Sequence, residues 1–313
     1  MRVLTIEKPG LQSVLQGAPR TGFRHRGVPR SGAADAYSLA LANRAVGNAP
    51  LATGIEIPGG QFSCTFRTET MICILGATAN LALSSRPVRP GTTVPVKPGD
   101  RLLISGLADG MRVYVAVRGG LKARSIMGSP STYLPARLGG IGRALQVGDD
   151  LALADDAIDE PQALPADLLI PPSTRHVLRC CDGAEFESLS PTSQHDLFER
   201  DFIVSSRLDR MGVGLEGPPL EIDSQGTMKS APVFPGTIQC PEGGAPFILL
   251  ADAQTTGGYP RVAQIIAADR FQLGQLRPGD QVRLMRVTPA AALRVLEAKA
   301  AALKSIGIPI SAL

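Results

Sequence analysis

A short turn that ends in Gly-Asp occurs three times in the chain, each time just before a strand-like segment. The three copies are Val96–Ile104, Leu145–Leu153 and Leu276–Leu284. Each copy begins with an apolar residue, turns tightly and continues as a strand, a pattern typical of turns that lead a strand into a barrel. Copies near residues 100, 150 and 280 predict two barrel-like halves. We interpret the motif as structural rather than catalytic.

Residues that interrupt helices support this interpretation. The 313 residues include 34 glycines and 26 prolines, spread along the whole chain. Such a distribution predicts many short strands and excludes an α-rich or doubly wound fold. The length suits two domains. A Pro/Ala/Asp-rich stretch, Ala154–Pro172, is the expected linker, so we predict one β-barrel domain over residues 1–160 and a second over residues 161–313.

Few segments have helical character. Ala34–Val46 carries small and apolar residues at helical spacing and stops at Gly47. Ser193–Asp201 is a second candidate. Thr288 and Pro289 precede an Ala/Leu/Lys-rich run that ends at Gly307, which predicts a C-terminal helix packed on a barrel.

Composition excludes several function classes. The net charge is +4, aromatic residues make up 4% and Trp is absent, so no platform for stacking nucleic-acid bases is expected. The five cysteines form no C-x-x-C pair, and the three histidines lie at no metal-ligand spacing. The first residues do not resemble a signal peptide, and no apolar run approaches the ~20 residues that span a bilayer. We therefore expect a cytoplasmic protein with free thiols, no membrane partner and no zinc-type metal site.

The polar stretch at residues 252–260 is the strongest candidate for a functional segment. It follows Pro246–Ala251, an apolar run short enough to be a buried strand. An acid, an amide, two hydroxyls and two glycines then come in succession, on a backbone free to adopt unusual conformations. This composition favours contact with a small polar or anionic ligand. The alternative is a simple side-chain-capped turn between two strands.

Three further segments interrupt the β pattern. Gly27–Asp35 enters the first predicted helix, where Ser31 and Asp35 would face an anion or else cap the helix. Arg118 follows a strand beside two glycines, which suits capture of a carboxylate, although it would equally be a surface arginine at a turn. Ser206–Gly217 combines charges that rarely enter a strand unless they bind a ligand or form an exposed ion pair.

No phosphate-binding glycine loop, nucleophile elbow or H-E-x-x-H motif occurs. The remaining groups suit positioning, proton transfer and polarisation of a carbonyl. The candidate catalytic residues are Asp209, Arg210, Asp252, Gln254 and Tyr259. The candidate substrate-binding residues are Ser31, Asp35, Asn43, Arg118, Ser131, Thr132, Arg207, Ser230, Gln239, Thr255 and Thr256.

Taken in order, these segments resemble one family. The motifs that carry the resemblance are Gly27–Asp35 with Ala42–Asn48, Val115–Gly120, Ser206–Gly217, and Pro235–Gln239 through Thr256–Pro260. They resemble the biotin-dependent carboxyltransferase-like group, which includes the C-type component of bacterial 5-oxoprolinase, the second subunit of allophanate hydrolase and the carboxyltransferase part of urea carboxylase. The resemblance covers nearly the whole chain. It implies a mainly β fold of two cyclophilin-like open β-barrel domains, with a few short helices and a C-terminal helix.

For stand-alone members the resemblance implies ATP-dependent opening of the 5-oxoproline lactam to L-glutamate. It implies ATP and Mg²⁺ shared with two partners. One is a companion of related fold, of the type found as the first subunit of allophanate hydrolase or the B-type component of 5-oxoprolinase, and the other is a lactam-cleaving A-type component. In this scheme Arg118 or Arg210 would clamp the substrate carboxylate, and Asp252 or Asp209 would hold Mg²⁺ or accept the lactam N–H.

Two departures and two alternatives accompany the resemblance. The family's Q-D-x-G-R is Gln16–Arg20 here, with Gly17 in place of the acid, and its Gly-Pro is here Gly183-Ala184. One alternative is a carboxyltransferase component that transfers a carboxyl group from carboxybiotin to a urea-like amide; only this alternative would involve biotin. The other is a regulatory binding subunit without turnover.

Overall fold

The computed structural model describes residues 2–154, 158–222 and 228–312, so residues 155–157 of the expected linker lie outside the described residues. The chain forms two compact units. Unit 1 comprises residues 1–21, 31–172 and 300–313, and unit 2 comprises residues 22–30 and 173–299. Both units are therefore discontinuous in sequence, a feature that a single predicted boundary at residue 160 did not anticipate.

In the described residues, unit 1 is built on one antiparallel sheet, with one α-helix of its own and the last residues of a second. Its strands are β1 (Arg2–Pro9), β2 (Val14–Gln16), β3 (Gly54–Pro58), β4 (Phe62–Phe66), β5 (Thr70–Leu83), β6 (Arg86–Pro87), β7 (Thr93–Val96), β8 (Arg101–Val117) and β9 (Asp150–Ala152). Its helices are α1 (Ala36–Ala45) and the 3₁₀ turns η2 (Leu134–Ala136), η3 (Ala166–Leu168) and η6 (Ile310–Ala312).

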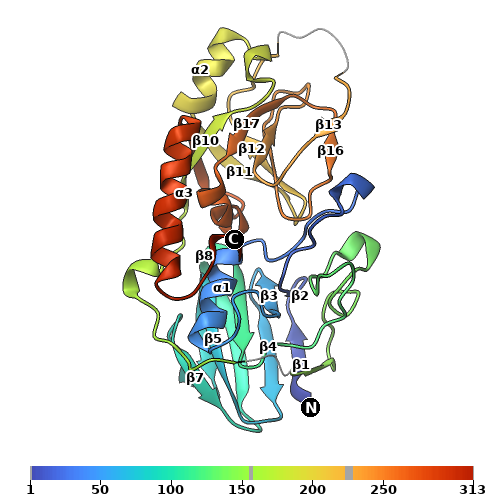
Figure 1. Ribbon diagram of the computed structural model, residues 1–313, viewed down its shortest axis with the longest axis vertical. Coiled ribbons are helices and arrows are strands. Elements are labelled where there is room, and N and C mark those ends of the chain that lie inside the picture. Colours follow the sequence, from blue (N-terminus) through green and yellow to red (C-terminus); the bar gives the residue numbers. More distant parts are fainter. Residues whose placement is uncertain (1, 155–157, 223–227, 313) are drawn as a thin grey trace. The chain divides into compact units, whose positions relative to one another are not determined.

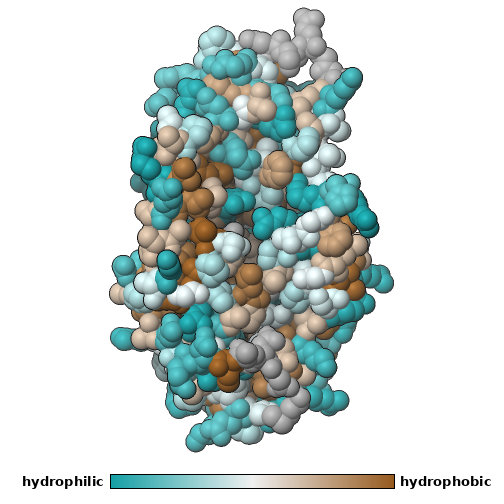
Figure 2. All heavy atoms as spheres, viewed as in Figure 1, coloured by the Kyte–Doolittle hydropathy of each residue, from teal (hydrophilic) through white to brown (hydrophobic). Residues whose placement is uncertain are grey.

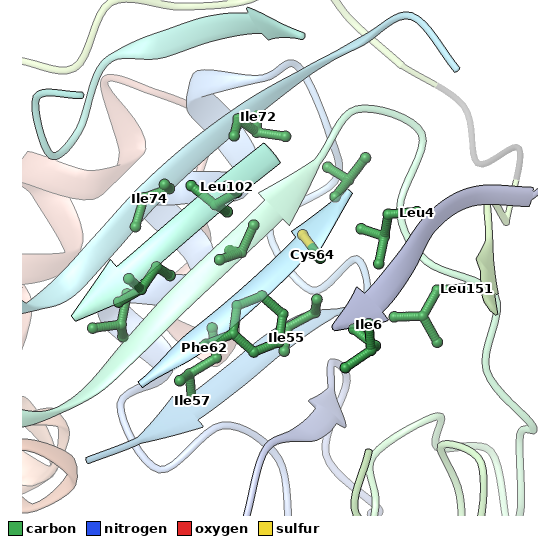
Figure 3. Packing of buried hydrophobic residues seen from close by; sticks show 14 of the residues in the cluster. Leu4, Ile6, Ile55, Ile57, Phe62, Cys64, Ile72, Ile74, Leu102 and Leu151 are labelled. Atoms are coloured by element: carbon green, nitrogen blue, oxygen red, sulfur yellow. The ribbon is translucent and has the colours of Figure 1, made fainter. Parts of the chain in front are cut away.

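The sheet of unit 1 runs in the order β2-β3-β8-β4-β1-β9, and β5 adds to β8 and carries β6 and β7. Alternate residues of these strands point into one apolar core, where Ile55, Ile57 and Phe62 are fully buried (Figure 3). On the other side α1 packs its small residues against β5 and β8 (Figure 1). Ala42 and Ala45 permit this close approach.

Unit 2 contains the shorter strands and most of the remaining helices. Its strands are β10 (Arg175–Asp182), β11 (Asp201–Leu208), β12 (Gly212–Glu216), β13 (Ala231–Pro232), β14 (Thr237–Gln239), β15 (Phe247–Leu249), β16 (Thr256–Gly257), β17 (Arg261–Ile265) and β18 (Gln281–Arg286). Its helices are α2 (Pro191–Glu199) and the 3₁₀ segments η1 (Arg24–Arg26), η4 (Phe186–Ser188) and η5 (Ala267–Gln275); α3 (Pro289–Lys304) begins in unit 2.

Seven strands of unit 2 close into a barrel in the order β10-β17-β14-β15-β12-β11-β18. The barrel closes through β18, which pairs in parallel with β10 and antiparallel with β11. A separate two-stranded sheet joins β13 to β16 and includes part of the polar stretch 252–260. The mainly β prediction and the predicted helices are confirmed. Unit 2 is a closed rather than an open barrel, whereas the sheet of unit 1 does not close.

The three Gly-Asp turns have the same backbone geometry. The glycines have left-handed φ angles: +87° at Gly99, +85° at Gly148 and +93° at Gly279. In each copy the glycine N–H donates to one residue of a neighbouring strand, and the aspartate C=O accepts from the N–H of that same residue. The strand partners are Phe66, Ile6 and Val204, at 2.8 or 2.9 Å throughout.

The aspartate side chain closes each turn as well. One carboxylate oxygen accepts the backbone N–H three residues upstream, from Lys97 at 2.9 Å, Gln146 at 2.8 Å and Arg277 at 2.9 Å. Side-chain bonds of this kind favour turns over helix or sheet. In both units, therefore, the repeated motif joins a turn to a neighbouring strand through backbone hydrogen bonds.

Substitution of the three glycines by alanine tests this motif. A Cβ at Gly99, Gly148 or Gly279 would meet no atom within 4 Å, so only the left-handed backbone opposes the change. We expect each variant to lose about 1 kcal/mol of unfolding free energy, measured by urea denaturation followed by circular dichroism. Gly243→Ala is the control, because Gly243 also has open space but no left-handed φ. Equal stability in all four variants would contradict the interpretation.

Candidate functional site

Five buried polar residues surround the start of α1 in unit 1, and we call them the helix-start cluster. They are Ser31, Asp35, Glu56, Arg112 and Tyr114, each exposing 6% of its surface or less. Burial of so many polar groups is costly unless they bind one another or a ligand. Their hydrogen bonds therefore indicate which of them serve the fold.

Glu56 is the centre of the helix-start cluster. Its Oε2 accepts from the backbone N–H of Ala34 and from the hydroxyl of Tyr114, both at 2.9 Å. Its Oε1 lies 3.5 Å from Nε of Arg112. One buried acid thus fixes the approach to α1 against two strands.

Asp35 is the N-cap of α1. Its Oδ1 accepts from the backbone N–H of Ser38 at 2.9 Å, and its own backbone N–H donates to the Tyr114 hydroxyl at 2.8 Å. Burial, together with the charges of Glu56 and Asp35, raises the pKa of Tyr114 well above its usual value. Tyr114 is therefore a neutral phenol that donates to one acid and anchors the helix start.

Ser31 differs from the rest of the cluster. Its φ is +52°, in the left-handed region, which costs a non-glycine residue about 1–2 kcal/mol. Its Oγ is buried and makes no hydrogen bond within the described part of the chain. Backbone strain combined with an unsatisfied buried hydroxyl is typical of residues at ligand-binding sites.

Ser131 and Thr132 hold the segment that precedes Pro19. Ser131 Oγ accepts from the backbone N–H of Gly17 at 3.0 Å, and Thr132 Oγ1 donates to the C=O of Leu15 at 2.9 Å. A Cβ at Gly17 would lie 3.0 Å from both Leu51 O and Thr53 Oγ1. The acid absent from position 17 would therefore require its neighbours to move.

Asn43 and Arg118 satisfy backbone carbonyls near the end of α1. Asn43 Nδ2 donates to Ala52 O at 2.8 Å, and Arg118 Nη1 donates to Val46 O at 2.8 Å. A carbonyl at a helix C-terminus is a natural partner for a guanidinium. These bonds give both residues a structural task, and their predicted role in substrate binding stays a prediction.

In unit 2, Arg210 and Asp252 form a buried ion pair. Nε of Arg210 lies 2.7 Å from Oδ2 of Asp252, and Nη2 lies 3.1 Å from Oδ1. The backbone N–H of Asp252 also donates to Arg210 O at 2.9 Å. Both carboxylate oxygens thus accept from one guanidinium, so the pair fixes the base of the 252–260 loop. This geometry favours a positioning role for both residues.

Asp209 closes the tight turn before β12. Its Oδ1 accepts from the backbone N–H groups of Met211 and Gly212 at 2.7 and 3.0 Å. Arg207, on the preceding strand, is exposed. Within the described residues no group of three His, Cys, Asp or Glu side chains could hold a metal ion.

The remaining predicted residues of unit 2 gather around the 252–260 loop. Gln239 is buried, donates to Tyr259 O at 3.1 Å and accepts from Gln254 Nε2 at 3.4 Å. The side chains of Gln254, Thr256, Tyr259 and Ser230 are exposed, and Thr255 is half-buried. The loop therefore combines a fixed base with exposed amide and hydroxyl groups that suit hydrogen bonding to a small polar molecule.

Glu56, Arg112 and Tyr114 were not among the predicted site residues. Glu56 stands between two isoleucines of a buried strand, and this isolated charge in an apolar run was the available signal. Arg112 and Tyr114 flank Val113 in the long strand β8, where the apolar pattern gives no indication of a polar cluster.

Comparison with known proteins matches this architecture. The family model described as carboxyltransferase domain, subdomain A and B, matches residues 26–286. The chain is 34% identical to the C subunit of 5-oxoprolinase from Escherichia coli (strain K12), over 93% of this chain and 94% of that protein. It is 35% identical to the C subunit of 5-oxoprolinase from Haemophilus influenzae, over 90% and 91%.

A solved structure gives a further comparison. The crystal structure of the K. lactis urea amidolyase superposes with a TM-score of 0.92 at 29% identity, over 97% of this chain and 20% of that chain. The present chain therefore spans about a fifth of that larger protein. With a family model that matches residues 26–286 and two relatives matched along most of their length, this chain belongs to the carboxyltransferase domain family, subdomain A and B.

Proposed function

We propose that this chain is the C-type subunit of an ATP-dependent 5-oxoprolinase and helps to phosphorylate and open the 5-oxoproline lactam to L-glutamate. The supporting observation is the match with two proteins named as the C subunit of 5-oxoprolinase over more than nine-tenths of their length. The matched part of urea amidolyase is, in contrast, a fifth of a longer chain. Both relatives are named as subunits. This supports the proposal that companion subunits take part in the reaction.

In this proposal the residues of the chain bind and orient the substrate. The exposed side chains of Gln254, Thr256 and Tyr259 would form hydrogen bonds with the lactam amide, on a loop whose base Arg210 and Asp252 fix. ATP supplies the phosphoryl group that makes the stable amide carbon open to attack by water. Asp209 and Asp252 both engage partners within the chain, so this pair does not suit Mg²⁺, and we propose that companion subunits share in holding the nucleotide and its metal.

A second function has its own support. The family carries the description of a carboxyltransferase, and the K. lactis urea amidolyase superposes closely. A carboxyltransferase component would transfer a carboxyl group from carboxybiotin to a urea-like amide. A regulatory subunit would bind the small molecule without turnover. Along the described residues no helix has both the length and the apolar character needed to span a bilayer; a cytoplasmic location stays a prediction.

Reconstitution distinguishes these functions. The chain is co-purified with its companion subunits, and glutamate formation is followed with ATP and 5-oxoproline. We expect glutamate only when both substrates and all subunits are present. Carboxylation of a urea-like amide by a mixture that contains carboxybiotin would favour the carboxyltransferase instead. Ligand binding without any turnover would favour the regulatory subunit.

Substitution of Asp252 by Asn tests the base of the loop. The substitution removes the negative charge that pairs with the buried Arg210, so the 252–260 loop is expected to shift. We expect kcat for glutamate formation to fall by about 100-fold, because the substrate-binding groups are then displaced. Because Asp252 acts through Arg210, KM and kcat are measured separately, together with the unfolding transition. Asp201→Asn is the control, since it removes a charge from the more exposed ion pair with Arg283 in the same unit. Wild-type turnover in Asp252→Asn would remove Asp252 from the mechanism.

Substitution of Ser31 separates function from stability. Ser31→Gly removes the unsatisfied hydroxyl and relieves the left-handed backbone, so unfolding free energy should rise by about 1 kcal/mol. Ser31→Ala keeps the strain and removes only the hydroxyl. If the hydroxyl binds substrate or contacts a companion protein, the two variants should each lose about 3- to 10-fold in activity.

Ser85 provides the matched control for Ser31. It is also a serine with left-handed φ, +67°, but it is exposed. Ser85→Gly should therefore gain similar stability and keep full activity. Unchanged activity in both Ser31 variants would show that the buried hydroxyl has no functional task.

A further inference from the structure

Unit 2 contains a cavity of about 430 Å³ whose walls are mostly apolar. Phe234 and Pro235 form one side, Ile265 another, and Leu293 and Leu296 of α3 a third. On the face shown in Figure 2, apolar side chains also gather along α3. Volume and lining fall within the range of small-molecule sites.

One guanidinium faces this apolar space. Arg270, from η5, lines the cavity and is partly buried. Within the described part of the chain it forms no hydrogen bond and no ion pair, whereas Gln264, which also lines the cavity, donates to Pro235 O at 3.1 Å. A partly buried cation without an acid is uncommon, because desolvation favours the neutral form or a partner.

Two more arginines of unit 2 lie close by. The Arg24 guanidinium stacks on the Phe234 ring, 4.8 Å from its centre, and donates to the neutral carbonyls of Val233 and Thr255. Arg30 likewise has no acid partner in the described residues. The positive charge of Arg30 acts on both Arg24 and Arg270, and an anion would relieve the repulsion among these like charges.

Burial and like charge shift the pKa values of two of these groups in the same direction. Burial lowers the pKa of Arg270, and the positive charge of Arg30 lowers it further. The pKa of Arg24 is lowered by the same two causes, in the same order. Arg30 therefore acts electrostatically on both of the other guanidinium groups.

We propose that this cavity binds a small carboxylate with an apolar body, held by Arg270 in a bidentate pair and flanked by the apolar walls. Carboxylate is favoured over phosphate because a doubly charged group would be costlier to desolvate between apolar walls. Arg24 and Arg30 supply an attractive field without direct contact. The proposal does not depend on the 5-oxoprolinase function.

A cysteine in the cavity wall allows ligand binding to be measured by chemical modification. Cys181 lines the cavity and is partly exposed, while Cys64, Cys73, Cys180 and Cys240 are buried. Burial, and the charge of Asp182, raise the pKa of the Cys181 thiol, so alkylation is followed at alkaline pH. The probe is 4-phenylbutyrate, and 4-phenylbutanamide is its neutral counterpart.

We expect 4-phenylbutyrate to slow alkylation of Cys181 in a saturable manner and the amide to slow it far less. In Arg270→Gln the apparent Kd of the carboxylate should rise about 10- to 100-fold, because a charge-assisted pair is lost. Arg294→Gln, an exposed arginine of α3 outside the cavity lining, should leave the Kd unchanged. Circular dichroism confirms that each variant is folded.

Three results would overturn the proposal. They are equal protection by the carboxylate and the amide, an unchanged Kd in a folded Arg270→Gln variant, and no protection up to the solubility limit of the carboxylate. Arg270→Lys refines a positive result, because a lysine keeps the charge but loses the planar fork. An intermediate Kd for this variant would support the bidentate pair.

Discussion

The left-handed glycine of the Gly-Asp turn is the constraint on which both units depend. It lets the turn place its own N–H and the following C=O against one residue of a strand already in the sheet, as at Phe66 and Val204. A side chain at that glycine would resist the conformation, and without the aspartate the N–H three residues earlier would lose its acceptor. In both units, therefore, the same backbone and carboxylate hydrogen bonds join the turn before a strand to a neighbouring strand. The sheets themselves differ, because the sheet of unit 2 closes into a barrel.

This dependence explains why the fold was predictable. Turn geometry is local, so Gly-Asp followed by an apolar segment carries its own signal, and so do the cap and proline that begin α3. The assignment of residues 22–30 to unit 2 and of residues 300–313 to unit 1 was not predictable, because it depends on contacts with residues distant in sequence rather than on local preference. Barrel closure through the β10–β18 pair is non-local for the same reason.

The candidate site was predictable only as a set of segments. The sequence indicated the 252–260 loop and the Gly27–Asp35 stretch as candidates, but it could not show which polar groups satisfy one another. Asp252 and Arg210 are forty-two positions apart and bind each other, while Asn43 binds backbone carbonyls of the following loop. Arg270 carried no signal, because a lone arginine in a 3₁₀ segment resembles any surface arginine until its surroundings are known.

Buried polar groups that stabilise the fold can be distinguished from those with another role by the partners that they bind within the chain. Arg210 donates to both carboxylate oxygens of Asp252, and Glu56 accepts from Ala34 and Tyr114. These hydrogen bonds stabilise the fold, so folding alone accounts for burying both residues. Ser31 keeps a strained backbone and an unsatisfied hydroxyl, and Arg270 stands partly buried among like charges. Folding gains nothing from either arrangement, and substitution to a less costly residue is a single step. A bound molecule would offset the cost of each arrangement, and each residue identifies a different place to look for one.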